Sequence, residues 1–122
     1  PLASRLAQPV KIESSVAELP SPDISLSERG PWLHGILKGR WTDSGDTIQS
    51  WRSNIISYLQ SLHQPHVIFT HFVVINAVLT YVEQDDNVLC FHPDNGSVTH
   101  LQVTAYKISL VSRGDESKTV IN

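Results

Sequence analysis

His71 lies at the junction of two apolar segments, and its position suits the binding of a phosphoryl group. Residues 67–69 predict a short buried strand, and the almost wholly apolar residues 72–82 predict a buried helix. Ligands of open α/β sheets bind where the carboxyl end of a strand leads into a helix. The free backbone N–H groups at the start of that helix favour an anion. A capping or packing histidine is the alternative interpretation.

Three histidines near this junction also suggest a metal site, because imidazoles are common zinc ligands. His63 and His66 come before the expected strand, whereas His71 follows it. With a rise of about 3.3 Å per strand residue, His66 and His71 are roughly 16 Å apart, too far for one ion. The sequence therefore predicts neither a metal ion nor another cofactor.

Four segments of this sequence, in their order along the chain, resemble parts of the histidine phosphatase superfamily, also called the phosphoglycerate mutase-like family. The junction at His71 resembles its second histidine motif, in which a strand ending in Val-Ser-His-Gly or a variant precedes a helix. Asn-Gly-Ser-Val-Thr at 95–99 resembles the start of a strand further along the family's chain. Residues 1–7 and 9–13 look like the helix and strand after its conserved arginine segment. Val-Ala-Glu at 16–18 looks like the stretch that carries its acidic residue.

The resemblance implies a phosphohistidine intermediate and gives three residues a role. His71 would bind the phosphoryl group and stabilise its developing charge. Glu18 would be the general acid, for which partial burial would have to raise its pKa. The alternative for Glu18 is a solvated loop residue or a helix-capping partner. Glu28 is the substitute candidate for the general acid, but it also fits a capping box. Phe72 stands where many members have glycine, so it would narrow the substrate-binding pocket while leaving its backbone N–H available.

The family's nucleophile is absent from these residues. It is the histidine of an Arg-His-Gly motif, which does not occur here, and the usual second arginine segment is also missing. The chain contains no methionine and begins at Pro1. We therefore expect residues 1–122 to be one domain, the C-terminal portion of a histidine phosphatase domain. The parent would be a phosphomonoester hydrolase or a mutase, and this portion alone would be inactive. A catalytically dead binding or scaffolding module is the alternative.

The expected fold is a layered α/β/α sandwich with a mainly parallel central sheet, truncated at its N-terminal side. This follows from strands and helices that alternate along the chain, together with the resemblance. Strands are expected at 10–13, 67–69, 88–91, 97–103 and 107–112, the last two as a hairpin. Helices are expected at 25–29, 31–38, from 44 or 46 to 62, and at 72–82. Gly30 is expected to interrupt the first two, and Gly39 to end the second in a left-handed conformation.

The strand at 67–69 is apolar on both faces and should be central in the sheet. In the resembled family it pairs near the strand that carries the nucleophile. Without that neighbour, backbone groups that ought to be buried would remain unpaired, which is costly. We therefore expect a homo-oligomer formed by strand pairing or swapping.

Composition limits the classes of partner. The net charge of −3 gives no basic surface, so nucleic acid is not expected. No stretch reaches the ~18 apolar residues that span a bilayer, so no membrane is expected either. Cys90 is the sole cysteine, which excludes an internal disulfide and favours a reduced, cytoplasmic setting. The expected ligand is a phosphorylated small molecule, or a phosphate or sulfate anion.

Overall fold

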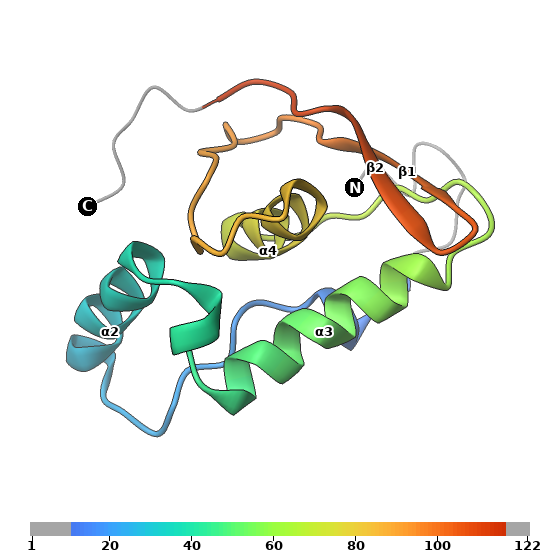
Figure 1. Cartoon of the computed structure of the whole chain (residues 1–122). Coiled ribbons are helices and arrows are strands. Elements are labelled where there is room, and N and C mark those ends of the chain that lie inside the picture. Colours follow the sequence, from blue (N-terminus) through green and yellow to red (C-terminus); the bar gives the residue numbers. More distant parts are fainter. Residues whose placement is uncertain (1–10, 117–122) are drawn as a thin grey trace.

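The computed structural model describes residues 11–116, which form a mixed α/β arrangement of three α-helices and one hairpin (Figure 1). In chain order its elements are η1 (Ser14–Val16), α2 (Leu26–Lys38), η2 (Trp41–Asp43), α3 (Asp46–Gln60), α4 (Phe72–Glu83), β1 (His100–Thr104) and β2 (Lys107–Ser112). The helix expected within residues 1–7 lies outside the described residues. Of the strand expected at 10–13, residues 11–13 are described, and they belong to no strand.

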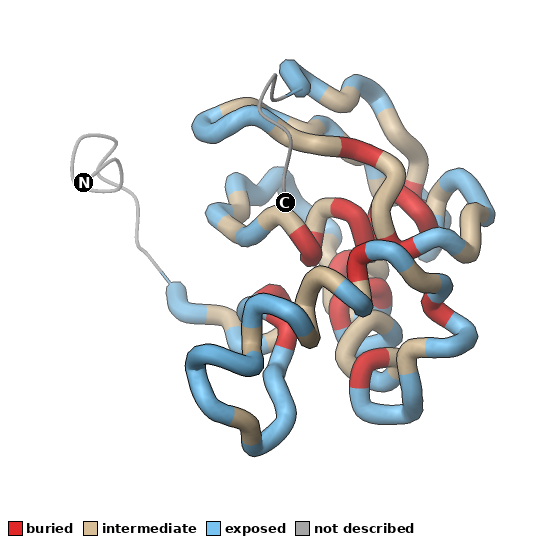
Figure 2. Tube along the Cα trace, turned by 90° about the vertical axis from the view of Figure 1, so that its left-hand side faces the viewer, coloured by how far each residue is buried: buried red, intermediate tan, exposed pale blue. Residues whose placement is uncertain are grey.

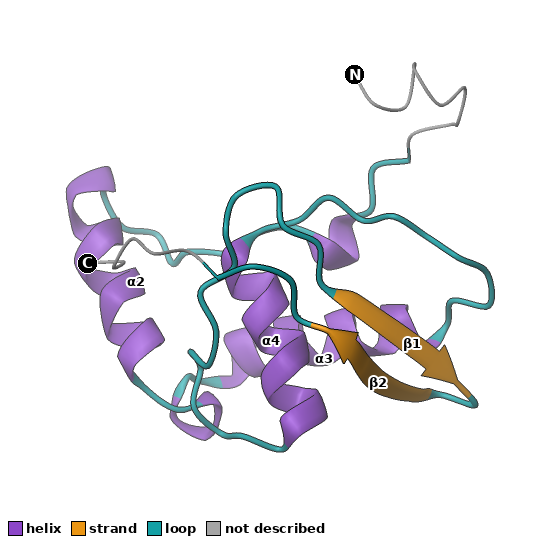
Figure 3. Cartoon of the chain, turned by 90° about the horizontal axis from the view of Figure 1, so that it is seen from above, coloured by secondary structure: helices purple, strands orange, loops and turns teal. Residues whose placement is uncertain are grey.

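The core forms between α3 and α4, and both helices also contact β2. The helices expected at 44–62 and 72–82 are confirmed as α3 and α4. α3 buries a single stripe that includes Ile48, Ile55 and Leu59, as its three- and four-residue spacing predicts. α4 is buried on most of its surface, because α3 and β2 pack against it. It lies between α2 and the hairpin in both views (Figures 1 and 3). Buried positions accordingly gather in the middle of the molecule (Figure 2).

α2 is one continuous helix, so the prediction of a break at Gly30 was wrong. Pro31 lies in its second turn and cannot supply the N–H that would bond Ser27. Of the two residues that could begin the helix, Asp23 and Ser25, the N-cap is Ser25. Its Oγ donates to the Glu28 carboxylate at 2.8 Å and makes no hydrogen bond to the helix backbone. Gly39 ends the helix in extended backbone, not in the left-handed conformation that we expected.

The expected hairpin is confirmed as the antiparallel pair β1 and β2, with Val103 opposite Ile108. Its two-residue turn, Ala105 and Tyr106, has positive φ at both positions, which matches the right-handed twist of the strands. β1 begins at His100, later than the strand expected from residue 97.

The strands predicted at 67–69 and 88–91 are not formed among residues 11–116, whose two-stranded sheet is antiparallel. Residues 67–69 belong to a stretch with no helix or strand, and a strand requires a partner that local sequence cannot provide. At 90–91 a side chain supplies the hydrogen bonds instead, as described below. A parallel central sheet therefore remains an expectation. No helix of residues 11–116 has the length and apolar character needed to cross a membrane.

Candidate functional site

His71 is the N-cap residue of α4, at the junction where the sequence placed it. Its backbone is extended (φ −116°, ψ 160°), and its carbonyl accepts the N–H of Ile75 at 3.1 Å. The N–H groups of the three residues between them have no partner within the helix, as at any α-helix start. The imidazole is exposed and makes no capping hydrogen bond within the described chain. At this end of α4 the His71 side chain is exposed, Phe72 is half-buried, and Val73 and Val74 are buried.

One hydrogen bond ties the His71 corner to the segment that carries Glu18. Thr70 Oγ1 donates to the carbonyl of Val16 at 2.8 Å, although the two residues are far apart in sequence. The next carbonyl, of Ala17, accepts the indole N–H of Trp51 at 3.1 Å. The segment before Glu18 is thus bonded both to Thr70, which precedes His71, and to Trp51 on α3.

Glu18 itself is solvated, with 51% of its side chain exposed. Its carboxylate lies 3.4 Å from the guanidinium of Arg29 on α2. The partial burial expected of a general acid is therefore absent in the described residues. Glu28, the substitute candidate, accepts the hydroxyl of Ser25 at the start of α2, but neither side chain bonds a backbone N–H, so the expected capping box is not formed. Arg29 was not predicted, because an isolated arginine in a helical stretch carries no sequence signal.

Phe72 is half-buried and packs against the hydrophobic core. Its ring stacks on that of His92, with centroids 5.9 Å apart and planes 20° apart. The Nε2 atom of His92 is buried and has no hydrogen-bond partner among the described residues. His92 lies in a loop and is partly buried. Phe72 thus has a packing contact in addition to its expected place at the ligand site.

Asn76 holds the chain segment after α4 against the start of that helix. It is fully buried, and its Oδ1 accepts the backbone N–H groups of Cys90 (2.9 Å) and Phe91 (3.0 Å). Its Nδ2 donates to the carbonyls of Phe91 (2.8 Å) and Phe72 (3.2 Å). Sequence reasoning missed this residue, although it is the one polar side chain in the otherwise apolar stretch 72–79.

Cys90 is partly buried beside this bridge. Burial is the main cause that raises the pKa of its thiol, and the charge of Glu83 acts in the same direction. A thiol with a raised pKa is a poor nucleophile at neutral pH. The cysteine therefore fits the packing role that the sequence suggested.

A second cluster surrounds Arg52 near the other end of α4. Its guanidinium lies 4.6 Å from the centre of the Trp41 ring and donates to the Ala77 carbonyl (3.1 Å) and Thr80 Oγ1 (3.0 Å). Thr80 Oγ1 also accepts the indole N–H of Trp41, which is buried and not in a surface loop. Burial lowers the pKa of Arg52, and the charge of Asp86 opposes that effect.

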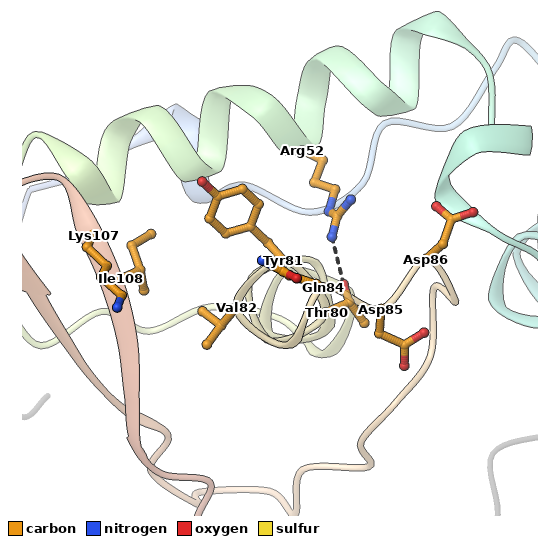
Figure 4. A pocket seen from close by; sticks show the side chains of 9 residues that line it. All are labelled: Arg52, Thr80, Tyr81, Val82, Gln84, Asp85, Asp86, Lys107 and Ile108. Atoms are coloured by element: carbon orange, nitrogen blue, oxygen red, sulfur yellow. Dashed lines mark hydrogen bonds between the residues drawn. The ribbon is translucent and has the colours of Figure 1, made fainter.

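A cavity of about 470 Å³ opens beside this cluster (Figure 4). Its lining comes from α3, β2 and the carboxyl end of α4, and includes Arg52, Tyr81, Asp86 and Lys107. Both oxygens of Asp86 accept hydrogen bonds from Thr42. The cavity therefore lies at the opposite end of α4 from His71, and its arginine is held by structural contacts.

Residues 11–116 contain no group of three or more histidine, cysteine or acidic side chains arranged to hold a metal ion. No family model, curated protein or solved structure matches this chain. The resemblance to histidine phosphatases therefore remains a prediction. The structure therefore shows an exposed imidazole at the start of α4, and a neighbouring segment, joined to it through Thr70 and Val16, whose Glu18 carboxylate pairs with Arg29.

Proposed function

We propose that this chain carries the phosphate-binding part of a phosphomonoester hydrolase domain of the histidine phosphatase type. In this proposal His71 binds the phosphoryl group and Glu18 donates a proton to the leaving oxygen. Phe72 limits the pocket beside them. The nucleophilic histidine belongs to a segment outside these 122 residues. The full domain is then a layered α/β/α sandwich in which residues 67–69 are a central parallel strand.

The observation that carries this proposal is the hydrogen bond between Thr70 Oγ1 and the Val16 carbonyl. It joins the residue before His71 to a segment that reaches Glu18 two residues later. It supports the proposal by bringing the segments that carry His71 and Glu18 into contact. The Glu18 carboxylate itself pairs with Arg29 on α2, so in the proposal it leaves that partner to act at the site.

The chemistry follows from the charges that phosphoryl transfer creates. In this proposal, negative charge on the phosphoryl oxygens is stabilised by an N–H of the His71 ring and by the N–H groups of the first turn of α4. The leaving oxygen needs a proton, which a carboxylic acid can donate. Neither group can form the covalent intermediate, so the isolated chain binds phosphate without turning over an ester.

The second candidate is a catalytically silent module that binds a phosphorylated ligand through the same residues. The absence of an Arg-His-Gly motif from the sequence favours it. Both candidates require His71 for binding. They differ only in whether a nucleophile joins the site in the full protein.

Isothermal titration with inorganic phosphate tests the shared claim. We expect weak binding that His71→Ala lowers by at least about fivefold, because the hydrogen bond from the ring to the charged phosphate is lost. His63→Ala is the matched control, since it removes an exposed histidine away from α4 and should change the affinity by less than about twofold. Equal binding by the wild type and His71→Ala would contradict the proposal.

Turnover of p-nitrophenyl phosphate tests the assignment of the nucleophile. We expect none above background from the 122-residue chain. Turnover that His71→Ala abolished would show that the chain has its own nucleophile, and the proposed division of the site would be wrong.

A further inference from the structure

Residues 66–70 form a segment whose backbone N–H and C=O groups have no backbone hydrogen-bond partner among the described residues. The segment connects the end of α3 to the start of α4 (Figure 1). An extended backbone with free donors and acceptors is a template for a further strand.

The side chains of this segment alternate as they do in a strand that is buried on one face. Ile68 packs against the core, and Thr70 is tied to Val16. Val67 and Phe69 point away from the core and are 79% and 77% exposed. Two large apolar side chains are thus left in water beside unpaired backbone, which association with another strand would remedy.

We infer that in the 122-residue chain, without the neighbouring strands that the proposed full domain would supply, this segment pairs antiparallel with the same segment of a second copy of the chain. A two-fold axis through Ile68 would place Ile68 opposite Ile68 and Val67 opposite Phe69 of the other copy. Aromatic side chains opposite β-branched ones are favourable cross-strand pairs. Because the arrangement is isologous, each contact occurs twice and the dimer is closed.

Charge favours a second copy over a charged partner strand. No Asp, Glu, Lys or Arg occurs from residue 53 to residue 82, so two copies meet without like-charge repulsion. Natural edge strands are protected by charges, prolines or bulges. After Pro65 this segment has none of these, and its short, uncharged, β-branched and aromatic sequence is typical of strands that pair with themselves.

Sedimentation velocity over protein concentrations up to about 1 mM tests this inference in the wild-type chain. We expect a monomer–dimer equilibrium, with amide hydrogen exchange at 66–70 slowed only at concentrations where the dimer forms. A monomer at every concentration overturns the inference, and so does a dimer in which exchange at 66–70 is unchanged.

Charge substitutions test the register. Val67→Lys with Phe69→Lys sets lysines opposite lysines, and should weaken dimerisation at least about tenfold. Val67→Glu with Phe69→Glu should do the same. An equimolar mixture of the two variants should form the heterodimer, because each lysine then faces a glutamate. Both positions are exposed, so each variant should keep its fold, which circular dichroism checks.

Val98→Lys is the matched control, since it places the same charge on another exposed valine (73%) outside the segment. It should dimerise as the wild type does. Lysine variants at 67 and 69 that dimerise like the wild type, or a mixture that fails to pair, overturn the register. Weakening by Val98→Lys equal to that of the double variant places the interface elsewhere.

Discussion

His71 occupies a backbone conformation that places its imidazole outside the helix while its carbonyl bonds Ile75. An N-cap serine or asparagine would satisfy one of the free N–H groups with its own side chain. His71 makes no such bond in the described chain, so the N–H groups of the first turn stay open. A residue that caps poorly but carries a titratable ring is expected where an anion binds.

Glu18 can be tested separately from His71 through its charge. Inorganic phosphate has no leaving oxygen for Glu18 to protonate, so in our account the Glu18 carboxylate, which pairs with Arg29 in the structure, opposes its binding by like charge. Glu18→Gln should therefore strengthen phosphate binding by about two- to fivefold at low salt, measured by titration calorimetry. Glu28→Gln removes the same charge from an exposed position at the start of α2 and is the control. Equal effects of the two variants on the affinity would show that Glu18 does not lie near the bound phosphate.

Arg52 illustrates a residue whose role depends on distant partners. Its stacking on Trp41 and its bonds to Ala77 and Thr80 join α3 to α4. The sequence places Arg52 on the polar side of α3 and Trp41 in a loop. Neither position reveals that the two meet, because the contact depends on how the helices pack.

At the scale of elements, Asn76 fixes the segment 90–91 to α4 without a strand. Asn76→Ala would leave two backbone N–H groups and a carbonyl buried without partners, and should lower the free energy of unfolding by about 3 kcal/mol. Urea denaturation measures this loss. Asn54→Ala removes the same amide from an exposed position on α3 and should change stability by less than about 0.5 kcal/mol. A similarly small effect at Asn76 would contradict the bridging role.

The sequence predicted the elements whose signals are local. Apolar spacing identified α3 and α4, and alternation identified the hairpin. The sequence did not predict structure that depends on hydrogen bonds between residues far apart along the chain. Residues 88–91 look like a strand by composition, but the amide of Asn76 satisfies the backbone of Cys90 and Phe91. α2 continues through Pro31 although proline in the second turn of a helix removes a hydrogen bond and crowds the carbonyl four residues earlier, so packing and not local propensity must hold this helix together.

At the scale of the whole molecule, α4 separates two regions of different chemistry. Its amino end carries His71 and lies beside the tethered Glu18 segment. Its carboxyl end borders the cavity around Arg52 and Lys107 (Figure 4). The position of His71 before a helix was readable from the sequence. The approach of residue 16 to residue 70 was expected only through the family resemblance, since no local pattern encodes it.

These two regions also make the central claim directly testable. The claim is that phosphate binds at the amino end of α4, between His71 and the Glu18 segment. The two cationic side chains at the other end, Arg52 and Lys107, offer the competing location within the described chain.

The most direct measurement is a titration of the ¹⁵N-labelled chain with inorganic phosphate, followed by two-dimensional amide NMR. Our account predicts the largest shifts at His71, at the first-turn amides of Phe72, Val73 and Val74, and near Glu18. Shifts confined to the lining of the Arg52 cavity, or no saturable shift at the start of α4, would contradict it.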